Sequence, residues 1–368
     1  MTNICTFRTL SQVCVKRKCP KVHLKELRKL YSTHNNKPNR VIFSGIQPTG
    51  IPHLGNYLGA IKHWVKLQNK PGDIYYSIVD LHSLTIPKSR TFMRTSILDI
   101  TACLLACEIN PERAVLYQQS CVPEHTLLSW VIGCLVPVNR LKHLPQWKEK
   151  QMPSVDGGGH IGRYTYPLLQ TADILLYKAT HVPAGDDQAV HLILTNEFAK
   201  SFNRTHGHFF PQTQIISDPT FARIRDLRNP TVKMSKSSQS ENGRIEITDY
   251  DDAIRGKIKR AITDCTSAVT YDPDNRPGVS NLVQIHCGLS DITPTEACNT
   301  AQNMDTGAYK TLVANVVIDH LSPIRERYFE LRQDENRLKE ILKYGNQRAA
   351  KVAKENFNAV RDLLGIQL

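Results

Sequence analysis

Long apolar runs are absent from this sequence of 368 residues. The longest uncharged apolar stretch, Leu127 to Val138, has about 12 residues, whereas a membrane-spanning helix needs about 20. No membrane segment is therefore expected. The ten cysteines are too sparse for a disulfide scaffold, and none of them forms the Cys-x-x-Cys pair typical of structural zinc sites. We expect a reducing compartment and no metal held by side chains.

Acidic residues are scarce at the N-terminus. Residues 1–40 contain ten Lys or Arg and a single acid, Glu26, and so carry most of the formal net charge of +13. A basic, acid-poor segment with scattered Ser and Thr and no apolar core is typical of an organelle transit peptide, not of a secretory signal. We expect residues 1–39 to be a mitochondrial transit peptide that directs the chain to the matrix. A basic RNA-binding tail is the alternative.

Strands and helices alternate after this arm. Short β-rich runs at 41–46, 74–79 and 114–118 are separated by helical patterns at 55–70 and 89–107. Such alternation predicts an α/β fold with a doubly wound parallel sheet, a Rossmann-like nucleotide-binding domain. Ligands in this fold bind beyond the carboxyl ends of the strands.

Helical patterns dominate the rest of the chain. We expect helices at 127–150 and 164–178, and a further helix up to about 202 that begins in a loop. A Gly-x-Gly-x-x-Gly match at 157–162 follows no apolar strand, so it is rejected as a dinucleotide site. Beyond about 248 strand-like runs vanish. The expected domains are a catalytic domain at 40–240, an α-helical domain at 241–340 and a C-terminal helix at 341–368.

Two separated motifs offer groups suited to phosphate. After the strand that contains Phe43, a Gly/Pro turn leads into His53-Leu54-Gly55-Asn56, which opens a helix. A helix N-terminus presents unpaired N–H groups and a positive dipole end. Lys233-Met234-Ser235-Lys236-Ser237 places two compact cations three residues apart. Each motif has an ordinary alternative, a strand–turn–helix junction and a solvated basic loop. Their joint presence favours a triphosphate site.

Polar side chains also mark one helix face and one loop. Tyr166, Gln170, Asp173 and Tyr177 follow helical spacing within a largely apolar segment. A buried carboxylate needs a donor, and the N–H or ammonium of an amino acid would serve. The loop 185–188 carries paired acids that could accept from ribose hydroxyls. A salt-bridged helix and an acidic N-cap are the alternatives.

The segments GIQPTG, HLGN, TADILLY, GDDQ and KMSKS, in this order, resemble class I aminoacyl-tRNA synthetases. More closely, they resemble the bacterial-type tryptophanyl-tRNA synthetases, over about residues 40–368. The resemblance implies ATP-dependent attachment of L-tryptophan to tRNA(Trp) through tryptophanyl-adenylate, with Mg²⁺, by a homodimer that serves mitochondrial translation. A tyrosyl-tRNA synthetase and a synthetase-derived RNA-binding protein without catalysis are the alternatives.

The resemblance also implies roles for individual residues. Asp173 would accept the indole N–H. The residues expected to stabilise phosphate charge are His53, Asn56, Lys150, Lys233 and Lys236. The residues expected to bind ATP are Gln47, His53, Leu54, Gly55, Asn56, Gly185, Asp186, Asp187, Ile224, Lys233, Met234, Ser235, Lys236 and Ser237. The residues expected to bind tryptophan are Phe43, His82, Tyr166, Gln170, Asp173 and Gln188. Two of these depart from the family pattern: Asp186 stands where many relatives have Glu, and Gln170 where some have Met.

Overall fold

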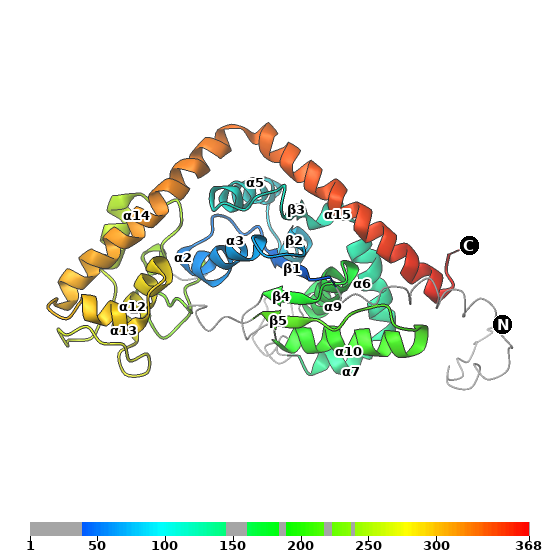
Figure 1. Ribbon diagram of the computed structural model, residues 1–368, viewed down its shortest axis with the longest axis horizontal. Coiled ribbons are helices and arrows are strands. Elements are labelled where there is room, and N and C mark those ends of the chain that lie inside the picture. Colours follow the sequence, from blue (N-terminus) through cyan, green and yellow to red (C-terminus); the bar gives the residue numbers. More distant parts are fainter. Residues whose placement is uncertain (1–38, 145–159, 184–188, 217–222, 237–239, 368) are drawn as a thin grey trace, which may run out of the picture. The chain divides into compact units, whose positions relative to one another are not determined.

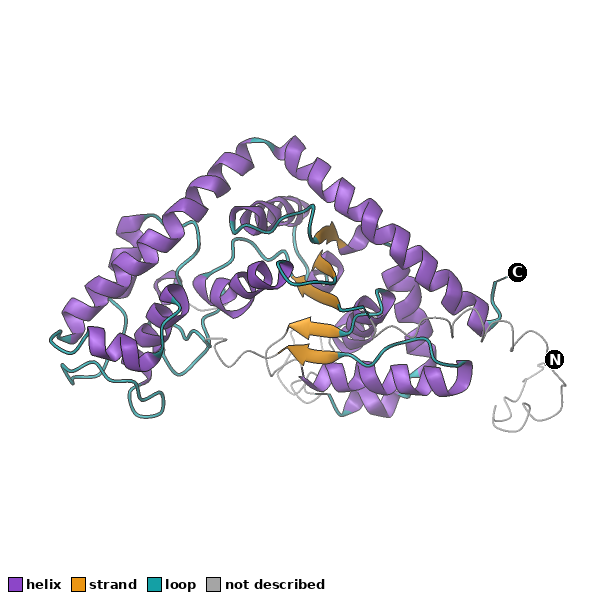
Figure 2. Ribbon diagram, viewed as in Figure 1, coloured by secondary structure: helices purple, strands orange, loops and turns teal. Residues whose placement is uncertain are grey.

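A parallel sheet of five strands forms the centre of the computed structural model (Figures 1 and 2). The structure describes residues 39–144, 160–183, 189–216, 223–236 and 240–367. Within these residues the strand order is β3-β2-β1-β4-β5, and every neighbouring pair is parallel. The strands are β1 (Val41–Ile46), β2 (Asp73–Ile78), β3 (Val115–Gln118), β4 (His181–Pro183) and β5 (Gln214–Ile216).

The predicted doubly wound sheet is confirmed. From β1 the chain builds outward to β2 and β3, then returns to the other side of β1 to add β4 and β5. The order therefore reverses between β1 and β4, which is where such sheets bind ligands. Strands β4 and β5 are not among the strands predicted from the sequence. Each has only three residues, too few for an alternating pattern to show, and Pro183 ends β4.

Helices cover both faces of the sheet (Figure 2). Ile42, Ile74 and Leu116 point into one apolar cluster, which includes residues of α5 and of the helical region beyond residue 250. Phe43 and Tyr117 belong to a second cluster, which includes residues of α6, α9 and α10. Alternate residues of a strand face opposite sides, so the sheet separates the two clusters. Asp173, on α9, belongs to the helix layer of the second face.

The described helices agree with the predicted ones in most places. The predicted helix at 55–70 is continuous but contains a π-helical turn, η1, and the predicted helix at 89–107 is α5, capped by the Ser89 hydroxyl. The elements are α2 (Leu54–Asn56), η1 (Tyr57–Ile61), α3 (Lys62–Gln68), α4 (Asp80–Ser83), α5 (Arg90–Ala106), η2 (Gln119–Cys121), α6 (Glu124–Leu135), α7 (Val138–Lys142), α9 (Gly162–Leu176), α10 (Ala189–His206), η5 (Glu241–Gly243), α11 (Asp251–Lys259), α12 (Pro277–Ser290), α13 (Pro294–Thr300), α14 (Thr306–Gln333) and α15 (Glu335–Leu364).

The single helix expected at 127–150 is wrong. Helix α6 ends at Leu135, Val136 is extended, and α7 begins only after Pro137. The residue before a proline is biased away from helical backbone, because the proline ring clashes with it. This proline signal outweighs the continuous apolar pattern around it. Residues 145–150 lie outside the described part of the chain.

Two long helices form the C-terminal part (Figure 1). Helix α14 packs against α5, α11 and α12, and α15 packs against β3, α5, α6 and α9. At the crossing with β3, a Cβ atom on Gly345 would lie 1.8 Å from the carbonyl oxygen of Leu116, so only glycine fits there. Residues 40–368 form one compact unit. The subdivision at 240 and 340 stays a prediction.

Two side-chain contacts connect the helix that follows the HLGN segment with the helical region beyond residue 250. The Tyr57 hydroxyl lies 2.6 Å from Nε2 of His320 on α14, and the Lys62 ammonium lies 2.9 Å from the Asp291 carboxylate. Both contacts join residues more than 200 positions apart. In the described part of the chain, no helix is long and apolar enough to span a membrane.

Candidate active site

Side chains of the predicted site gather at the carboxyl ends of the central strands. Strand β1 ends at Ile46 and leads into the turn before α2, while β2 leads into α4, which carries His82. The hydroxyl of Ser44, on β1, lies 3.4 Å from the carbonyl oxygen of Pro183 on β4, across the point where the strand order reverses. The fold thus places the turn before His53, and His82, where doubly wound sheets bind ligands.

His53 is the N-cap of the helix that begins with α2. Its Nδ1 accepts the backbone N–H of Asn56, and the Asn56 Oδ1 accepts the backbone N–H of His53. Burial, together with the charges of Lys236, Lys233 and Arg244, lowers the pKa of His53 from 6.5 to about 4. The ring is therefore neutral, and because Nδ1 accepts, the proton lies on Nε2. Nε2 of His53 and Nδ2 of Asn56 are the donors these two residues can offer a ligand.

The Lys233–Lys236 segment lies against the HLGN turn. The Lys236 ammonium donates to the carbonyl oxygens of Gly50, at 2.7 Å, and Thr49, at 3.1 Å. A Cβ on Gly55 would lie 3.5 Å from Cβ of Met234. Segments about 180 residues apart in the sequence are therefore in direct contact. Burial lowers the pKa of Lys236 to about 8, whereas the Lys233 side chain is exposed.

Three predicted ATP residues are part of the core. Leu54, Ile224 and Met234 are at most 2% exposed and belong to the same apolar cluster. The Met234 N–H also donates to the Ile224 carbonyl oxygen, at 3.0 Å. Their side chains thus hold the HLGN segment and the Lys233–Lys236 segment against the apolar core. A contact between adenine and Ile224 stays a prediction. Gln47 is exposed at the end of β1, and Ser235 is half-buried.

Asp173 is a buried carboxylate with several hydrogen-bond donors. It is 1% exposed, and its two oxygens accept from His82 at 2.8 Å, His125 at 2.6 Å and the Gln119 amide at 2.7 Å. Burial raises the pKa of Asp173, but the opposing effect of His125 and His82 is larger and holds it well below its usual value. The group is therefore ionised at neutral pH, although it is removed from water.

Aromatic rings lie beside this carboxylate. Phe43 stacks on Tyr177 with ring centroids 6.1 Å apart, and the His82 ring meets Tyr166 edge-on at 6.2 Å. The Tyr166 hydroxyl lies 3.4 Å from Nε2 of His191. The expected helix face is thus present on α9, with Tyr177 just beyond its last residue. The rings and the carboxylate thus lie side by side, and a tryptophan site there stays a prediction.

Sequence reasoning missed the residues that hold Asp173. Gln119 and His125 come from η2 and α6, and Asp80 accepts from the backbone N–H of Ser120 at 3.0 Å, which braces the same turn. The available signal was the polar run that begins at Gln118, where the predicted third strand ends. Lys150, Ser237 and the predicted ribose loop lie outside the described residues, the loop residues being Gly185, Asp186, Asp187 and Gln188.

Comparison with known proteins decides the family. A family model described as "tRNA synthetases class I (W and Y)" matches residues 35–322, a range that includes every predicted site residue. The chain belongs to this family.

Three proteins similar to this chain are named for tryptophan. The mitochondrial tryptophan–tRNA ligase of Dictyostelium discoideum is 36% identical over 366 residues, covering 90% of this chain and 97% of its own length. The tryptophan–tRNA ligase of Helicobacter pylori is 39% identical, covering 88% and 98%. A solved structure of tryptophanyl-tRNA synthetase from Campylobacter jejuni, complexed with ADP and tryptophan, has a TM-score of 0.74 at 28% identity and covers 89% and 99%.

Proposed function

We propose that this protein is a tryptophan–tRNA ligase, which activates L-tryptophan with ATP and transfers it to tRNA(Trp) for mitochondrial translation. The observation that carries the proposal is the contact between Lys236 and the turn before His53, beside the strand ends where doubly wound sheets bind ligands. This contact joins the two segments suited to phosphate. The similar proteins from Dictyostelium and Helicobacter have the same activity in their names.

The first step needs positioning and charge stabilisation. The tryptophan carboxylate attacks the α-phosphorus in line, which releases pyrophosphate and forms the adenylate. A carboxylate is already ionised at pH 7, so no general base is required. Neutral His53 donates from Nε2 and Asn56 from Nδ2 to the phosphate oxygens on one side. Lys233 and Lys236 neutralise the charge that develops on pyrophosphate from the other side, and Lys150 is proposed to join them.

Magnesium fits this site through the nucleotide. Among the described residues there is no group of three or more His, Cys, Asp or Glu that could hold a metal ion. The donors around the HLGN turn are N–H groups and ammonium, which suit anions. We therefore propose that Mg²⁺ arrives with ATP, bound to its phosphate oxygens, where it would neutralise part of their charge.

Asp173 is proposed to recognise the indole N–H. Its Oδ1 already accepts two hydrogen bonds, from His125 and Gln119, whereas the described structure gives Oδ2 one donor, His82. A carboxylate oxygen has two lone pairs, so Oδ2 keeps an acceptor position for a ligand. Indole has one ring donor and no acceptor, which matches a single acceptor position between aromatic rings.

The experiment that tests this function is pyrophosphate exchange with each of the twenty amino acids, followed by aminoacylation of tRNA(Trp). We expect exchange with tryptophan, and much weaker exchange with phenylalanine and tyrosine. Asp173→Ala should raise the KM for tryptophan and narrow its advantage over phenylalanine. A preference for tyrosine would move the assignment to the tyrosine enzyme. Absence of exchange with all twenty would favour a non-catalytic RNA-binding protein.

The helical region is proposed to bind the tRNA anticodon. Beyond residue 250 it consists of α11 to α15. Its His320 and Asp291 contact the helix that follows the HLGN segment. Lys351 and Lys354 are exposed on α15 and can meet a phosphate backbone. Changing both to Ala should weaken tRNA binding and leave pyrophosphate exchange unchanged. Loss of exchange in the well-folded double variant would contradict this division of labour.

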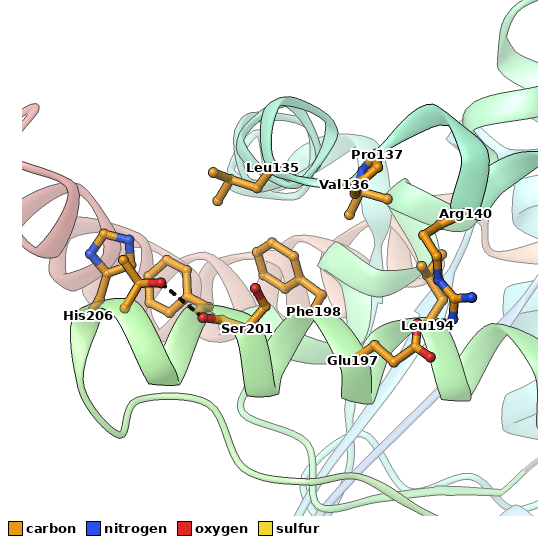
Figure 3. A pocket seen from close by; sticks show the side chains of 11 residues that line it. Leu135, Val136, Pro137, Arg140, Leu194, Glu197, Phe198, Ser201 and His206 are labelled. Carbon is orange, nitrogen blue, oxygen red and sulfur yellow. Dashed lines mark hydrogen bonds and ion pairs between the residues drawn. The ribbon is translucent and has the colours of Figure 1, made fainter. Parts of the chain in front are cut away.

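A homodimer is also part of the proposal, with α6 as its contact surface. Leu127, Trp130 and Cys134 lie on one exposed face of α6, and Trp130 is 75% exposed, which is unusual for the largest apolar side chain. A largely apolar cavity of about 230 Å³ lies beside this helix (Figure 3). Residues from the end of α6 to α7 line one side of it, and residues of α10 line the other. We propose that a second copy of the chain covers this exposed face of α6, as membership of the family favours.

The dimer surface can be tested by size. Trp130→Glu should convert the dimer to a monomer in sedimentation velocity, because a buried unpaired charge opposes association. Phe92→Glu, which changes an exposed apolar residue on α5, should leave the mass unchanged. A dimeric Trp130→Glu protein would place the interface elsewhere, and a monomeric wild type would remove the dimer from the proposal.

A further inference from the structure

The three donors to Asp173 come from three different elements. His82 lies on α4, Gln119 on η2 and His125 on α6, while Asp173 itself lies on α9. His125 and Gln119 are fully buried. A buried carboxylate is stable only when donors surround it, so these contacts fix where its two oxygens point.

The two oxygens of Asp173 are held differently. Oδ1 accepts from Nδ1 of His125 at 2.6 Å and from Nε2 of Gln119 at 2.7 Å, which fills both of its lone pairs. Oδ2 accepts from His82 at 2.8 Å. The two donors on Oδ1 therefore prevent the carboxylate from rotating and from turning Oδ1 towards a ligand.

The ionised Asp173 carboxylate can only accept, so it requires a proton on Nδ1 of His125, and two tyrosines lie at the other ring nitrogen. The hydroxyls of Tyr117 and Tyr177 each lie 3.1 Å from Nε2 of His125. Burial, together with nearby charge, raises the pKa of both phenols well above the usual value, so both keep their protons. The phenol hydroxyls can donate to Nε2 or accept from it, so they are compatible with an Nδ1–H that faces Asp173.

We propose that His125 is a positioning residue for amino-acid specificity. It acts through Asp173: its Nδ1–H fixes Oδ1, so that Oδ2 remains the acceptor for the ring N–H of the substrate. This inference rests on the proposed function, because it presumes that Asp173 binds the indole N–H. His125 touches neither ATP nor the reacting carboxylate in this scheme, so its removal should alter the choice of amino acid more than the use of ATP.

The test compares tryptophan with β-(3-benzothienyl)alanine, in which sulfur replaces the indole N–H and the shape is almost unchanged. The wild type should prefer tryptophan in kcat/KM for pyrophosphate exchange, because sites built around a substrate donor reject analogues that lack it. His125→Phe keeps the ring volume but removes the donor, and should reduce this preference by about tenfold or more, as expected for a hydrogen bond to a charged group. The KM for ATP should not change.

Two further variants separate positioning from packing. His125→Asn offers an N–H near the position of Nδ1 and should restore much of the preference. His286→Phe is the matched control: His286 is 5% exposed and lies 3.2 Å from the hydroxyl of buried Tyr309, but it belongs to α12. It should leave the preference unchanged. If His125→Phe does not fold, Gln119→Leu removes the other donor to Oδ1 and should lower the preference in the same way.

The possible failures are distinguishable. A wild type that uses both amino acids equally well would overturn the proposed role of Asp173 itself. A wild type that prefers tryptophan, with folded His125→Phe or Gln119→Leu proteins that keep the full preference, would overturn only the role of the donors on Oδ1. Equal loss in His125→Phe and His286→Phe would assign His125 to packing.

Discussion

Replacing Lys236 by alanine should slow adenylate formation much less than replacing Lys233, although the motif presents the two lysines as equivalent. The structure shows the difference. The Lys236 ammonium already donates to the carbonyl oxygens of Thr49 and Gly50, whereas the Lys233 side chain is exposed. Lys236 must therefore leave these oxygens to reach pyrophosphate, and Lys233 has no such contact to give up among those described.

The size of the difference follows from the two states that kcat/KM compares, free enzyme and transition state. Removing one donor that stabilises transition-state charge costs roughly 10²–10³ in rate, or about 2.7–4 kcal/mol. We expect this loss for Lys233→Ala. Lys236→Ala also removes charged hydrogen bonds from the free enzyme, worth about 1.5–3 kcal/mol. The net loss of transition-state stabilisation in Lys236→Ala should therefore be about 1 kcal/mol, which lowers kcat/KM roughly five- to tenfold.

The assay is tryptophan-dependent pyrophosphate exchange, with kcat/KM measured for ATP. Lys310→Ala provides a matched control, because the Lys310 ammonium donates to the Ala261 carbonyl oxygen at 2.8 Å, in the helical region. It should reduce stability without changing exchange. Equal losses in Lys233→Ala and Lys236→Ala, or a larger loss in Lys236→Ala, would refute the idea that the carbonyl contacts oppose the catalytic position of Lys236.

Three other predictions concern pH, packing and targeting. Lys236 acts as a cation, so kcat/KM should fall as the pH rises through its pKa of about 8, and Lys236→Arg should abolish this fall; His53, with a pKa of about 4, should add no transition near pH 6.5. Gly345→Ala should lower the unfolding temperature by several degrees, because its Cβ would overlap the Leu116 backbone, whereas Gly133→Ala, whose Cβ would make an ordinary contact of 3.6 Å with Cδ1 of Leu168, should not. Deleting residues 2–38 should leave aminoacylation in vitro nearly unchanged and abolish mitochondrial import, and lost activity with retained import would contradict the transit-peptide assignment.

Sequence patterns were sufficient for elements with a repeating signal. β1, β2 and β3, together with α5 and α9, follow from apolar spacing, and the parallel order follows from their alternation with helices. The two motif segments could be identified because each is a short local segment with a distinctive composition, and phosphate binding by them stays a prediction. Strands of three residues, such as β4 and β5, have no periodicity to detect, and the break at Pro137 depends on one residue within an apolar run.

The environment of Asp173 could not be predicted, for a different reason. Its donors lie 91, 54 and 48 positions away along the chain, and no local pattern links them. Only the packing of α4, η2 and α6 around α9 brings these polar side chains to one carboxylate. The same holds for the contact of Lys236 with Gly50, across 186 positions. Sequence identifies the reactive groups, but it does not identify the neighbours that set their charge and direction.

Asp173 is a buried charge and Lys236 a half-buried one, and their surroundings solvate them differently. Two backbone carbonyls solvate the Lys236 ammonium incompletely, because burial still lowers its pKa to about 8. His125 and His82 hold the pKa of Asp173 well below its usual value despite its burial. A poorly solvated cation gains by moving to a pyrophosphate anion, whereas a well-solvated carboxylate gains nothing by moving.

The amino acid would therefore be selected by a group held rigidly between helices. The leaving phosphates would be bound by a group that must first leave its resting contact. Under the proposed function, selection would depend on the fixed Asp173 carboxylate and activation on the movement of Lys236, so variants that weaken the Lys236 contact should change the rate of activation without changing which amino acid is chosen.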